Sequence, residues 1–492
     1  MKLSVCTNWD RSLLEGLASI PDVYEVFGSE DRSLFGSARP SIVLGRVEKE
    51  EMAQYIKKVH DKGLKFNYTI NAPCLNNMEF NKAVHEKMIG ELEMLVDMGI
   101  DGVTVAIPYL LELIKRRFPK LHVKVSVIAQ VNSIPKARFF EEMGADEILL
   151  DYMINRDFKL LENIRKSVKC DLSLLLNDLC TYGCAYRNYH YNVAGHASQS
   201  DHLSEGFCID YNTLRCSIER LKNPSLFISS RWIRPEDISC YEDIGYEYFK
   251  VAGRRMTADW ILNAAKAYST RKYEGNLSDI LDCSLPGMTD KALPMKFENI
   301  SSGISSIDVN SLMKLYQTKS EMPYIDNNSL EGFIEFFKND CCTGNCNACN
   351  YCKSYTDKVL RLEEDKTQVM QEAYNGLYTD LVESRIFYCS ESGDDCPAGT
   401  EEKRKVSDII WPDRVERLYD TIMGNIPDNF RSVARGASHR SIVEIARKRG
   451  SNEINEEDVL MGVIKNIPEA FRNNMINGLK QLGVDLSFLD RQ

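Results

Sequence analysis

The first 255 residues predict an α/β fold, a (β/α)8 barrel of the TIM type. Eight short runs rich in β-branched and apolar residues alternate with amphipathic segments. Such runs are typical of parallel strands that are buried on both faces. Eight strands with helices between them, in about 255 residues, match this barrel in number and in length. We therefore expect a barrel over residues 1–255, followed by smaller regions.

The predicted strands are 2–7, 23–28, 65–71, 102–107, 123–129, 147–151, 171–177 and 248–252. Segments between them, such as 50–63 and 134–146, have helical periodicity and contain a glycine before the next strand, a common helix stop. A doubly wound open sheet is the competing architecture. Neither a G-x-G-x-x-G nor a Walker A sequence follows an early strand, so a dinucleotide or P-loop site loses its main support.

The connection between the seventh and eighth strands, 178–247, is unusually long. It contains four cysteines between 180 and 216, a fifth at 240, three histidines and a further β-like piece at 226–233. A connection this long within a compact domain is usually functional. In a barrel it lies at the C-terminal face, where active sites gather.

The rest of the chain divides into three predicted regions. Residues 256–340 form an irregular extension that packs on the barrel and starts with a helix. Residues 341–408 form a cysteine-rich module, with a helix at 353–385 and a polar linker at 386–408. Residues 409–492 form a small all-α domain.

Composition limits the classes of function. The chain has 492 residues and a formal charge of −11, so no global charge attracts it to nucleic acid or to an anionic membrane. No apolar run approaches the ~18–20 residues of a membrane span, and no secretory signal is evident. We expect a cytoplasmic protein. Sixteen cysteines in such a chain indicate metal binding or redox chemistry rather than disulfides.

Four of the cysteines lie in the long connection: Cys180, Cys184, Cys208 and Cys216. Four thiolates from one loop could close a tetrahedral metal site or hold an iron–sulfur cubane. Their spacing is not that of a zinc ribbon, which uses C-x2-C pairs. Isolated cysteines in the core are the alternative.

A second set occupies the sequence DCCTGNCNACNYC, with Cys341, Cys342, Cys346, Cys349 and Cys352. The last three form the C-x2-C-x2-C run of bacterial ferredoxins, whose further ligand is followed by proline. Cys396 precedes Pro397 and is a candidate fourth ligand, as are Cys342, Cys341 and Cys389. The pattern favours iron–sulfur over zinc. We expect the remaining five cysteines to be structural: Cys6, Cys74, Cys170, Cys240 and Cys283.

The barrel, the cysteine loop and the closing segment 231–254 resemble the collagenase-like peptidase family U32, as do segments 126–151 and 271–281. The best-understood members of that family are oxygen-independent hydroxylation proteins for RNA bases or quinone precursors, with a four-iron–four-sulfur cluster on four cysteines. Carried over by position, the resemblance implies that Cys180, Cys184, Cys208 and Cys216 hold this cluster. The x3 and x7 spacings depart from those of the familiar hydroxylases, so the substrate does not transfer.

The C-terminal region is similar to the helical module that ends a subunit of light-independent protochlorophyllide reductase. The matched positions are Trp411, Ile426, Pro427, Arg431, Glu444, Ala446, Arg447, Gly450 and Ile454. This likeness implies a redox setting. By itself it does not imply a tetrapyrrole substrate.

Several polar residues are expected around the first cluster: Asn177, Asp178, Arg187, His190, His196 and His202. Histidine near cysteine can bind metal, shuttle protons or only hydrogen-bond, and His190 is the main catalytic candidate. The ends of the third and fifth strands add Asn71, Gln130 and Asn132 as candidate substrate contacts.

The end of the barrel adds basic and acidic candidates. Lys250, Arg254 and Arg255 end the last strand and could bind a carboxylate or a phosphate. Arg234, Glu236 and Asp237 form a turn that is expected to start a helix. Pairing of the basic residues with Glu236 or Asp237 is the alternative. The proposed catalytic set is His190, Lys250, Arg254, Glu236 and Asp178.

The cysteine sets predict a redox protein with one or two 4Fe-4S clusters, and the family resemblance implies an oxygen-independent hydroxylase. Its expected partners are a small-molecule or RNA substrate, an electron donor such as a ferredoxin, and a partner subunit. With an open iron, the first cluster could also act as a Lewis acid. A non-catalytic electron-transfer or scaffold subunit is the alternative. A peptidase is disfavoured, because G-x-S-x-G and H-E-x-x-H are missing and ligand cysteines cannot serve as nucleophiles.

Overall fold

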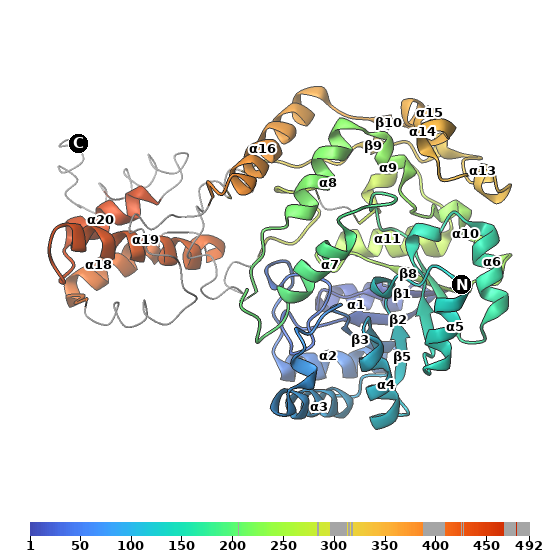
Figure 1. Ribbon diagram of the computed structural model, residues 1–492, viewed down its shortest axis with the longest axis horizontal. Helices are drawn as coiled ribbons and strands as arrows, with labels where there is room; N and C mark the ends of the chain where they lie inside the picture. The colour runs from blue at the N-terminus through green and yellow to red at the C-terminus, as the bar shows by residue number, and fades with distance from the viewer. Residues whose placement is uncertain are drawn as a thin grey trace. The chain divides into compact units, whose positions relative to one another are not determined.

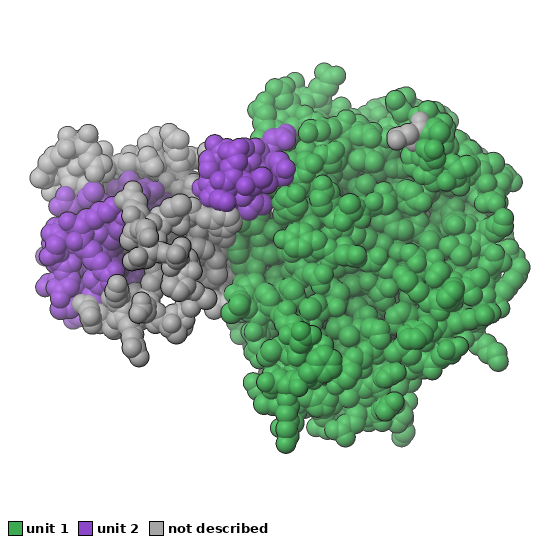
Figure 2. Space-filling view, viewed as in Figure 1, with its two compact units in different colours: residues 1–294, 319–374 green, residues 295–318, 375–492 purple. Residues whose placement is uncertain are grey.

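The computed structural model describes residues 1–204, 206–282, 285–295, 312, 315, 318–386, 409–424, 426, 428–466 and 479. The chain divides into two compact units, which Figure 2 colours separately. The first comprises residues 1–294 and 319–374, and the second comprises residues 295–318 and 375–492. The cysteine run at 341–352 therefore falls within the same unit as the N-terminal 294 residues.

The first unit is built on a closed barrel of eight parallel strands in sequence order (Figure 1). β1 pairs with both β2 and β8, which closes the sheet. The TIM-type barrel is thus confirmed, and the open doubly wound sheet is excluded. The strands are β1 (Lys2–Cys6), β2 (Val23–Gly28), β3 (Lys65–Ile70), β4 (Gly102–Val105), β5 (His122–Val125), β6 (Glu147–Leu149), β7 (Asp171–Leu175) and β8 (Tyr248–Val251).

Helices connect the strands and follow the last one. They are α1 (Arg11–Ala18), α2 (Lys49–Asp61), α3 (Lys82–Asp97), α4 (Pro108–Arg117), α5 (Ile134–Glu142), α6 (Phe158–Ser167) and α11 (Ala258–Thr270). Their boundaries follow from local chemistry. The Asp10 and Thr257 side chains accept hydrogen bonds from the first-turn amides of α1 and α11. Gly63 and Gly144 follow α2 and α5 with φ of 73° and 97°, where glycine is favoured.

The connection from β7 to β8 holds four helices: α7 (Arg187–His196), α8 (Tyr211–Lys222), α9 (Ser225–Ser229) and α10 (Ile238–Glu242). The prediction of a β-like piece at 226–233 is wrong, because α9 occupies its first half. Phe227 and Ile228 are fully buried on this helix. A short apolar run does not distinguish a strand from a buried helical turn, which explains the error.

The segment 353–385, predicted as one helix, is interrupted. α15 (Tyr351–Val359) is followed by β10 (Leu360–Arg361) and then by α16 (Glu364–Val382). β10 pairs antiparallel with β9 (Tyr324–Ile325), a partner far away in the sequence. The break is therefore imposed by tertiary pairing, which overrides the local helical pattern. Before these elements lie the short helices α13 (Glu335–Lys338) and α14 (Cys346–Cys349).

In the second unit, the predicted helical region at the C-terminus is confirmed. It contains α18 (Asp413–Gly424), α19 (Asp428–Lys448) and α20 (Glu456–Lys465). Their apolar faces share one core, which includes Tyr419, Ile422, Ile442 and Val463. Cys283, Cys389 and Cys396 lie outside the described residues. Among the helices that the structure describes, none is both long and apolar enough to span a bilayer.

Candidate functional site at the barrel mouth

The cysteine-bearing connection starts at the C-terminal end of the barrel. Cys180 packs against a cluster of buried side chains at the ends of β6, β7 and β8, namely Leu149, Tyr152, Leu175 and Ala252. Asp178 pairs through its backbone with Asp282 nearby. The connection therefore begins over the mouth of the barrel, the end at which barrel enzymes place their active sites.

The thirteen cysteines among the described residues are all free thiols. Cys180 and Cys184 interact as a hydrogen-bonded pair, which raises the pKa of Cys180 and lowers the pKa of Cys184 to about 6. The Arg220 guanidinium donates a 2.9 Å hydrogen bond to Cys216 Sγ. Cys216 and Cys184 also interact electrostatically. Burial raises the pKa of Cys208.

Within the described part of the chain, no three or more His, Cys, Asp and Glu side chains converge as the ligands of a single metal ion would. The ligands of a cubane do not converge on one point, because its own iron and sulfide atoms fill the space between the four thiolates. The loop thus provides free, soft ligands at the mouth without a preformed single-ion site.

His190 on α7 faces the carboxylate of Asp210, with 3.1 Å between His190 Nε2 and Asp210 Oδ2. Burial opposes a charged His190, but Asp210 outweighs it and raises the pKa of the imidazole. The charge of His190 in turn contributes to the low pKa of Cys184. The structure therefore places a protonatable side chain beside the thiols.

Arg187 attaches the start of α7 to the barrel. Its Nη1 donates to Asp151 Oδ2 at 2.9 Å, and its guanidinium lies 4.5 Å from the centre of the Tyr152 ring. Both charged groups are buried, so the ion pair is shielded from solvent. Arg187 thus positions the helix that carries His190.

Asp178 and Asp282 form an acidic pair beside Arg39. Burial and the charge of Asp282 raise the pKa of Asp178 to about 6. Arg39 Nη2 lies 3.1 Å from Asp282 Oδ2. Asn177, by contrast, has a structural role, since its amide donates to the Ala252 and Ile280 carbonyls.

Arg254 follows β8 and is only 7% exposed. Its Nη1 donates to Ser29 Oγ at 2.7 Å, Thr69 Oγ1 at 3.1 Å and Ser37 Oγ at 3.4 Å. Among the described residues, none of the ion pairs within 4.0 Å includes Arg254. Burial lowers the pKa of its guanidinium to about 9. A buried cation with only hydroxyl partners suits a carboxylate or phosphate ligand.

The barrel interior carries a charge cluster that was not predicted. Lys124 Nζ lies 2.8 Å from Glu25 Oε1 and 3.1 Å from Glu147 Oε1. The three residues are 1%, 4% and 1% exposed, respectively. The signal was present in the sequence, because each interrupts an otherwise apolar strand. A charge in a strand that is buried on both faces requires a partner.

Lys250 on β8 shares this interior. Its Nζ lies 3.6 Å from the centre of the Phe27 ring. Burial and the charge of Lys124 lower the pKa of Lys250 to about 7. Both its protonated and neutral forms are then available near neutral pH, as a general acid or base requires.

The acidic turn before β8 lies apart from these residues. Pro235–Asp237 forms a helical turn that starts with proline, as predicted. Arg234 pairs with Glu236 at 3.3 Å and with Asp237 at 4.0 Å, so the alternative pairing of Lys250 or Arg254 with these acids is not found. Glu236 Oε1 also accepts from Asn327 Nδ2 and the Tyr273 amide. These contacts of Glu236 include no other predicted catalytic residue.

The remaining candidates are distributed around the mouth. Asn71 donates to Ser126 Oγ, and Gln130 donates to Asn188 on α7. The rings of His196 and His202 stack at 4.5 Å between centroids. Asn132 is half-buried.

The second cysteine set is partly assembled. Burial raises the pKa of Cys352, Arg156 and Arg231 oppose that rise, and Cys346 and Cys342 add to it, so both thiols lie within electrostatic range of Cys352. Cys349 is half-buried, whereas Cys341 is exposed and directs its thiol to the Asn339 carbonyl. Of the fourth-ligand candidates, Cys342 is thus the one that the described residues bring to the set.

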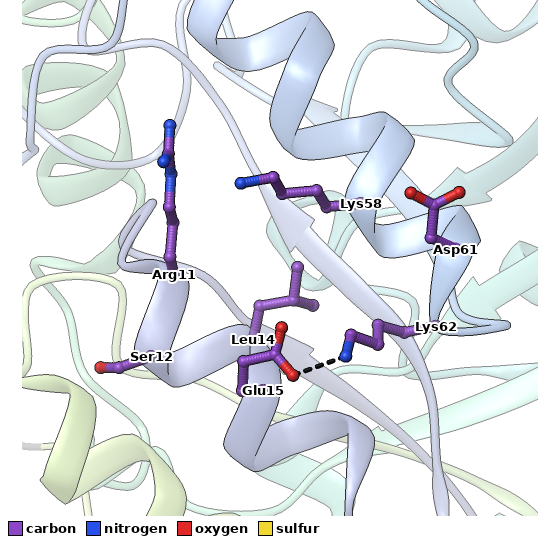
Figure 3. A pocket seen from close by; sticks show the side chains of 7 residues that line it. All are labelled: Arg11, Ser12, Leu14, Glu15, Lys58, Asp61 and Lys62. Carbon is purple, nitrogen blue, oxygen red and sulfur yellow. Dashed lines mark hydrogen bonds and ion pairs between the residues drawn. The ribbon is translucent and has the colours of Figure 1, made fainter.

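A surface hollow of about 360 Å³ lies elsewhere, between α1 and α2 (Figure 3). Its lining combines charged residues with Ser12 and the apolar Leu14, and Lys62 Nζ lies 2.5 Å from Glu15 Oε2. Because its lining comes from these two helices and not from the cysteine connection, it is not part of the candidate site.

Comparison with known proteins identifies the family. The model of peptidase family U32 matches residues 37–275, which include the whole cysteine-bearing connection. An uncharacterised protease of Methanocaldococcus jannaschii is 31% identical over 314 residues, covering 64% of this chain and 82% of that protein. The chain therefore belongs to peptidase family U32.

Two further similarities are more limited. The tRNA hydroxylation protein P of Escherichia coli is 28% identical over 121 residues, which is 24% of each chain. A solved structure of a U32 peptidase is 22% identical, with a TM-score of 0.39, and the match covers 51% of this chain and 93% of that one. The likeness of the C-terminal region to the protochlorophyllide reductase module stays a prediction.

Proposed function

We propose that this chain is an iron–sulfur enzyme that hydroxylates an anionic substrate at the barrel mouth without dioxygen. Cys180, Cys184, Cys208 and Cys216 would hold a 4Fe-4S cluster. The observation that carries the proposal is the presence of these free thiols at the same end of the barrel as the buried Arg254, whose partners are hydroxyl groups.

The residues present fit such a cluster. Thiolates are the soft ligands that iron–sulfur centres use. Metal binding requires the deprotonated thiolate. Burial raises the pKa of Cys216, and the charge of Arg220 and its hydrogen bond to the thiol oppose that rise. When bound by all four thiolates, the cluster supplies one-electron transfer.

Side chains of the barrel would bind the substrate and transfer a proton. Arg254 binds the anionic group of the substrate by charge-assisted hydrogen bonds. Lys250 accepts or releases a proton near neutral pH. Family membership, together with the partial match to a tRNA hydroxylation protein, supports hydroxylation of a small molecule or an RNA-borne nucleotide. The hydroxyl oxygen would come from water, and the two electrons released from the substrate would pass to a redox protein. The ferredoxin expected as an electron donor would therefore act here in its oxidised form, as an acceptor. A partner subunit belongs to the same proposal.

The test combines metal analysis with complementation. The protein is purified without oxygen, and its iron and sulfide are counted. A deletion strain is then analysed for a missing hydroxylated metabolite or nucleoside. We expect wild type and the surface variant Lys115→Met to restore it, whereas Arg254→Met retains iron but fails. Stoichiometric zinc with near-zero iron would refute the proposal. Full complementation by Arg254→Met would favour a non-catalytic electron-transfer subunit.

A thiol hydrolase is the second candidate, because one observation favours it. His190 pairs with Asp210 at 3.1 Å. The pKa of Cys184 is lowered to about 6, first by its hydrogen bond with Cys180 and further by the charge of His190. A thiol hydrolase uses the same three residue types. Single Cys→Ala variants separate the two functions. A cluster enzyme loses iron in all four variants. A hydrolase binds no iron, and only Cys184→Ala loses the thiol that reacts fastest with iodoacetamide near neutral pH.

A further inference from the structure

The second cysteine set packs against the connection that carries the first set. α15 lies against α9, and α13 lies against α6, so this region is part of the barrel unit. Aromatic side chains form the contact. Tyr351 stacks on Phe336 with 3.9 Å between ring centroids, and Phe333 stacks on Trp232 at 6.2 Å. These contacts fix the second cysteine set against the connection between β7 and β8.

Two buried guanidinium groups lie beside these thiols. Arg231 is 5% exposed, and its Nη2 lies 3.7 Å from Cys342 Sγ, whereas its Nε is buried without a hydrogen-bond partner. Arg156 is 3% exposed and donates to the carbonyls of Ile228 and Trp232. Both cations act on Cys352. Among the described residues, no ion pair within 4.0 Å includes either of them.

Two adjacent buried cations without a paired carboxylate are unfavourable in an apolar environment. The aromatic rings around Arg156 compensate only in part, since Trp232 and Phe333 lie 4.4 Å and 4.8 Å from its guanidinium carbon. Four thiolates on an iron–sulfur core carry a net negative charge, which would pair with both cations. The buried Asp237 carboxylate also acts on Arg156 but is not within ion-pair distance of it. The charge distribution thus favours an anionic group beside Cys342 and Cys352.

One aromatic contact joins the two cysteine sets. Tyr182 lies between Cys180 and Cys184 in the sequence, and its ring centre is 3.8 Å from the guanidinium carbon of Arg231. A Cβ atom built on Gly344 would lie 3.7 Å from the Tyr182 hydroxyl. Tyr182 therefore contacts both Arg231 and the loop that carries the second set.

We propose that Cys342, Cys346, Cys349 and Cys352 hold a second iron–sulfur cluster, which relays electrons from the first through the contact between Arg231 and Tyr182. The relay rests on the proposed function, whereas the second metal site does not. Hydroxylation with water as the oxygen source releases two electrons and two protons from the substrate. In each transfer, the reduced first cluster loses one electron and the oxidised second cluster gains it. An oxidised one-electron carrier protein then accepts the electron from the second cluster.

The metal site is tested on the full chain, purified without oxygen. We expect about eight irons and eight sulfides per chain. The double variant Cys346→Ser/Cys349→Ser should lose half of the iron and one of two electron paramagnetic resonance signals after reduction. Cys180→Ser/Cys184→Ser should lose the other signal. Cys341→Ser is the matched control and should retain the full iron content and both electron paramagnetic resonance signals.

The outcomes separate the two proposals. If Cys346→Ser/Cys349→Ser keeps all the iron, or if this site holds zinc, the inference is wrong even when the first cluster is present. If only Cys180→Ser/Cys184→Ser keeps all the iron, the proposed function fails while the second site stands.

The relay is tested by two further substitutions with full iron content. Arg231→Met should lower the midpoint potential of the second cluster, because a nearby positive charge is lost, whereas the surface variant Arg138→Met should not. Transfer is followed in the reverse direction, from a reduced one-electron carrier protein. Tyr182→Leu should slow the appearance of the first-cluster signal at least tenfold after rapid mixing with this carrier, and Tyr182→Phe should not. An unchanged potential in Arg231→Met together with an unchanged rate in Tyr182→Leu would overturn the relay.

Discussion

Replacement of Lys124 by methionine tests whether this residue neutralises two carboxylates inside the barrel. The Nζ atom lies 2.8 Å and 3.1 Å from Glu25 and Glu147, and all three groups are shielded from solvent. Removing one partner of a buried ion pair costs about 3–5 kcal/mol, because the remaining charge stays buried. The barrel unit has roughly 350 residues. With ~2.1 cal/mol/K of unfolding entropy per residue, its Tm should fall by about 4–7 °C.

The loss should also depend on pH. In the wild type, Lys124 overcomes the burial penalty and lowers the pKa of Glu25, so this contribution to stability is present above about pH 4.5 and is lost in acid. In Lys124→Met the buried carboxylates have raised pKa values, so protonation relieves the penalty as pH falls. Differential scanning calorimetry should therefore show that the difference in Tm between wild type and Lys124→Met becomes smaller from pH 8 to pH 5.

Lys115→Met is the matched control for this prediction. Lys115 pairs with Asp146 at 2.8 Å, but both side chains are partly exposed. Such a pair contributes about 1 kcal/mol or less. Equal Tm changes in the two variants, or a Lys124→Met gap that stays constant with pH, would refute the argument.

Three other perturbations test separate features. In the wild type, stability should rise between about pH 7 and pH 10, because the unfolded Lys250 still binds a proton there while the native one, with its pKa near 7, does not. Lys250→Met should remove this rise. Parallel curves of Tm against pH for wild type and variant would contradict this. Arg187→Met should cost about 3–5 kcal/mol by leaving Asp151 buried and unpaired, and it should reduce the iron content; full iron with an unchanged Tm would speak against the role given to α7. Gly102→Ala should cost about 1–3 kcal/mol, because the new Cβ would lie 2.6 Å from the His122 carbonyl oxygen, whereas Gly90→Ala, with open space around it, should not destabilise.

Much of the barrel was predictable because its signal is local. Each strand is a short apolar run that is buried on both faces, and each run can be recognised without knowledge of its neighbours. The interruption of helix 353–385 was not predictable in this way. It depends on pairing between Leu360 and Ile325, and no local pattern reports such a partner.

The candidate site shows the same division. The cysteine positions predict soft metal ligands from residue type and spacing alone. The pairing of Arg234 with Glu236, in contrast, removes that acid from contact with the basic residues at the end of β8. Arg39 and Asp282 were missed because they reach the mouth from connections with no distinctive motif.

The sequence by itself determined the (β/α)8 architecture, the two cysteine sets and the family resemblance, since these depend on local periodicity and residue type. Only the tertiary structure decided that Lys124 sits between two buried glutamates, that hydroxyl groups surround Arg254, and that Tyr182 and Arg231 join the two cysteine sets. Burial and charge pairing arise between residues far apart in the chain. They therefore appear only when the barrel closes and the later segments pack against it.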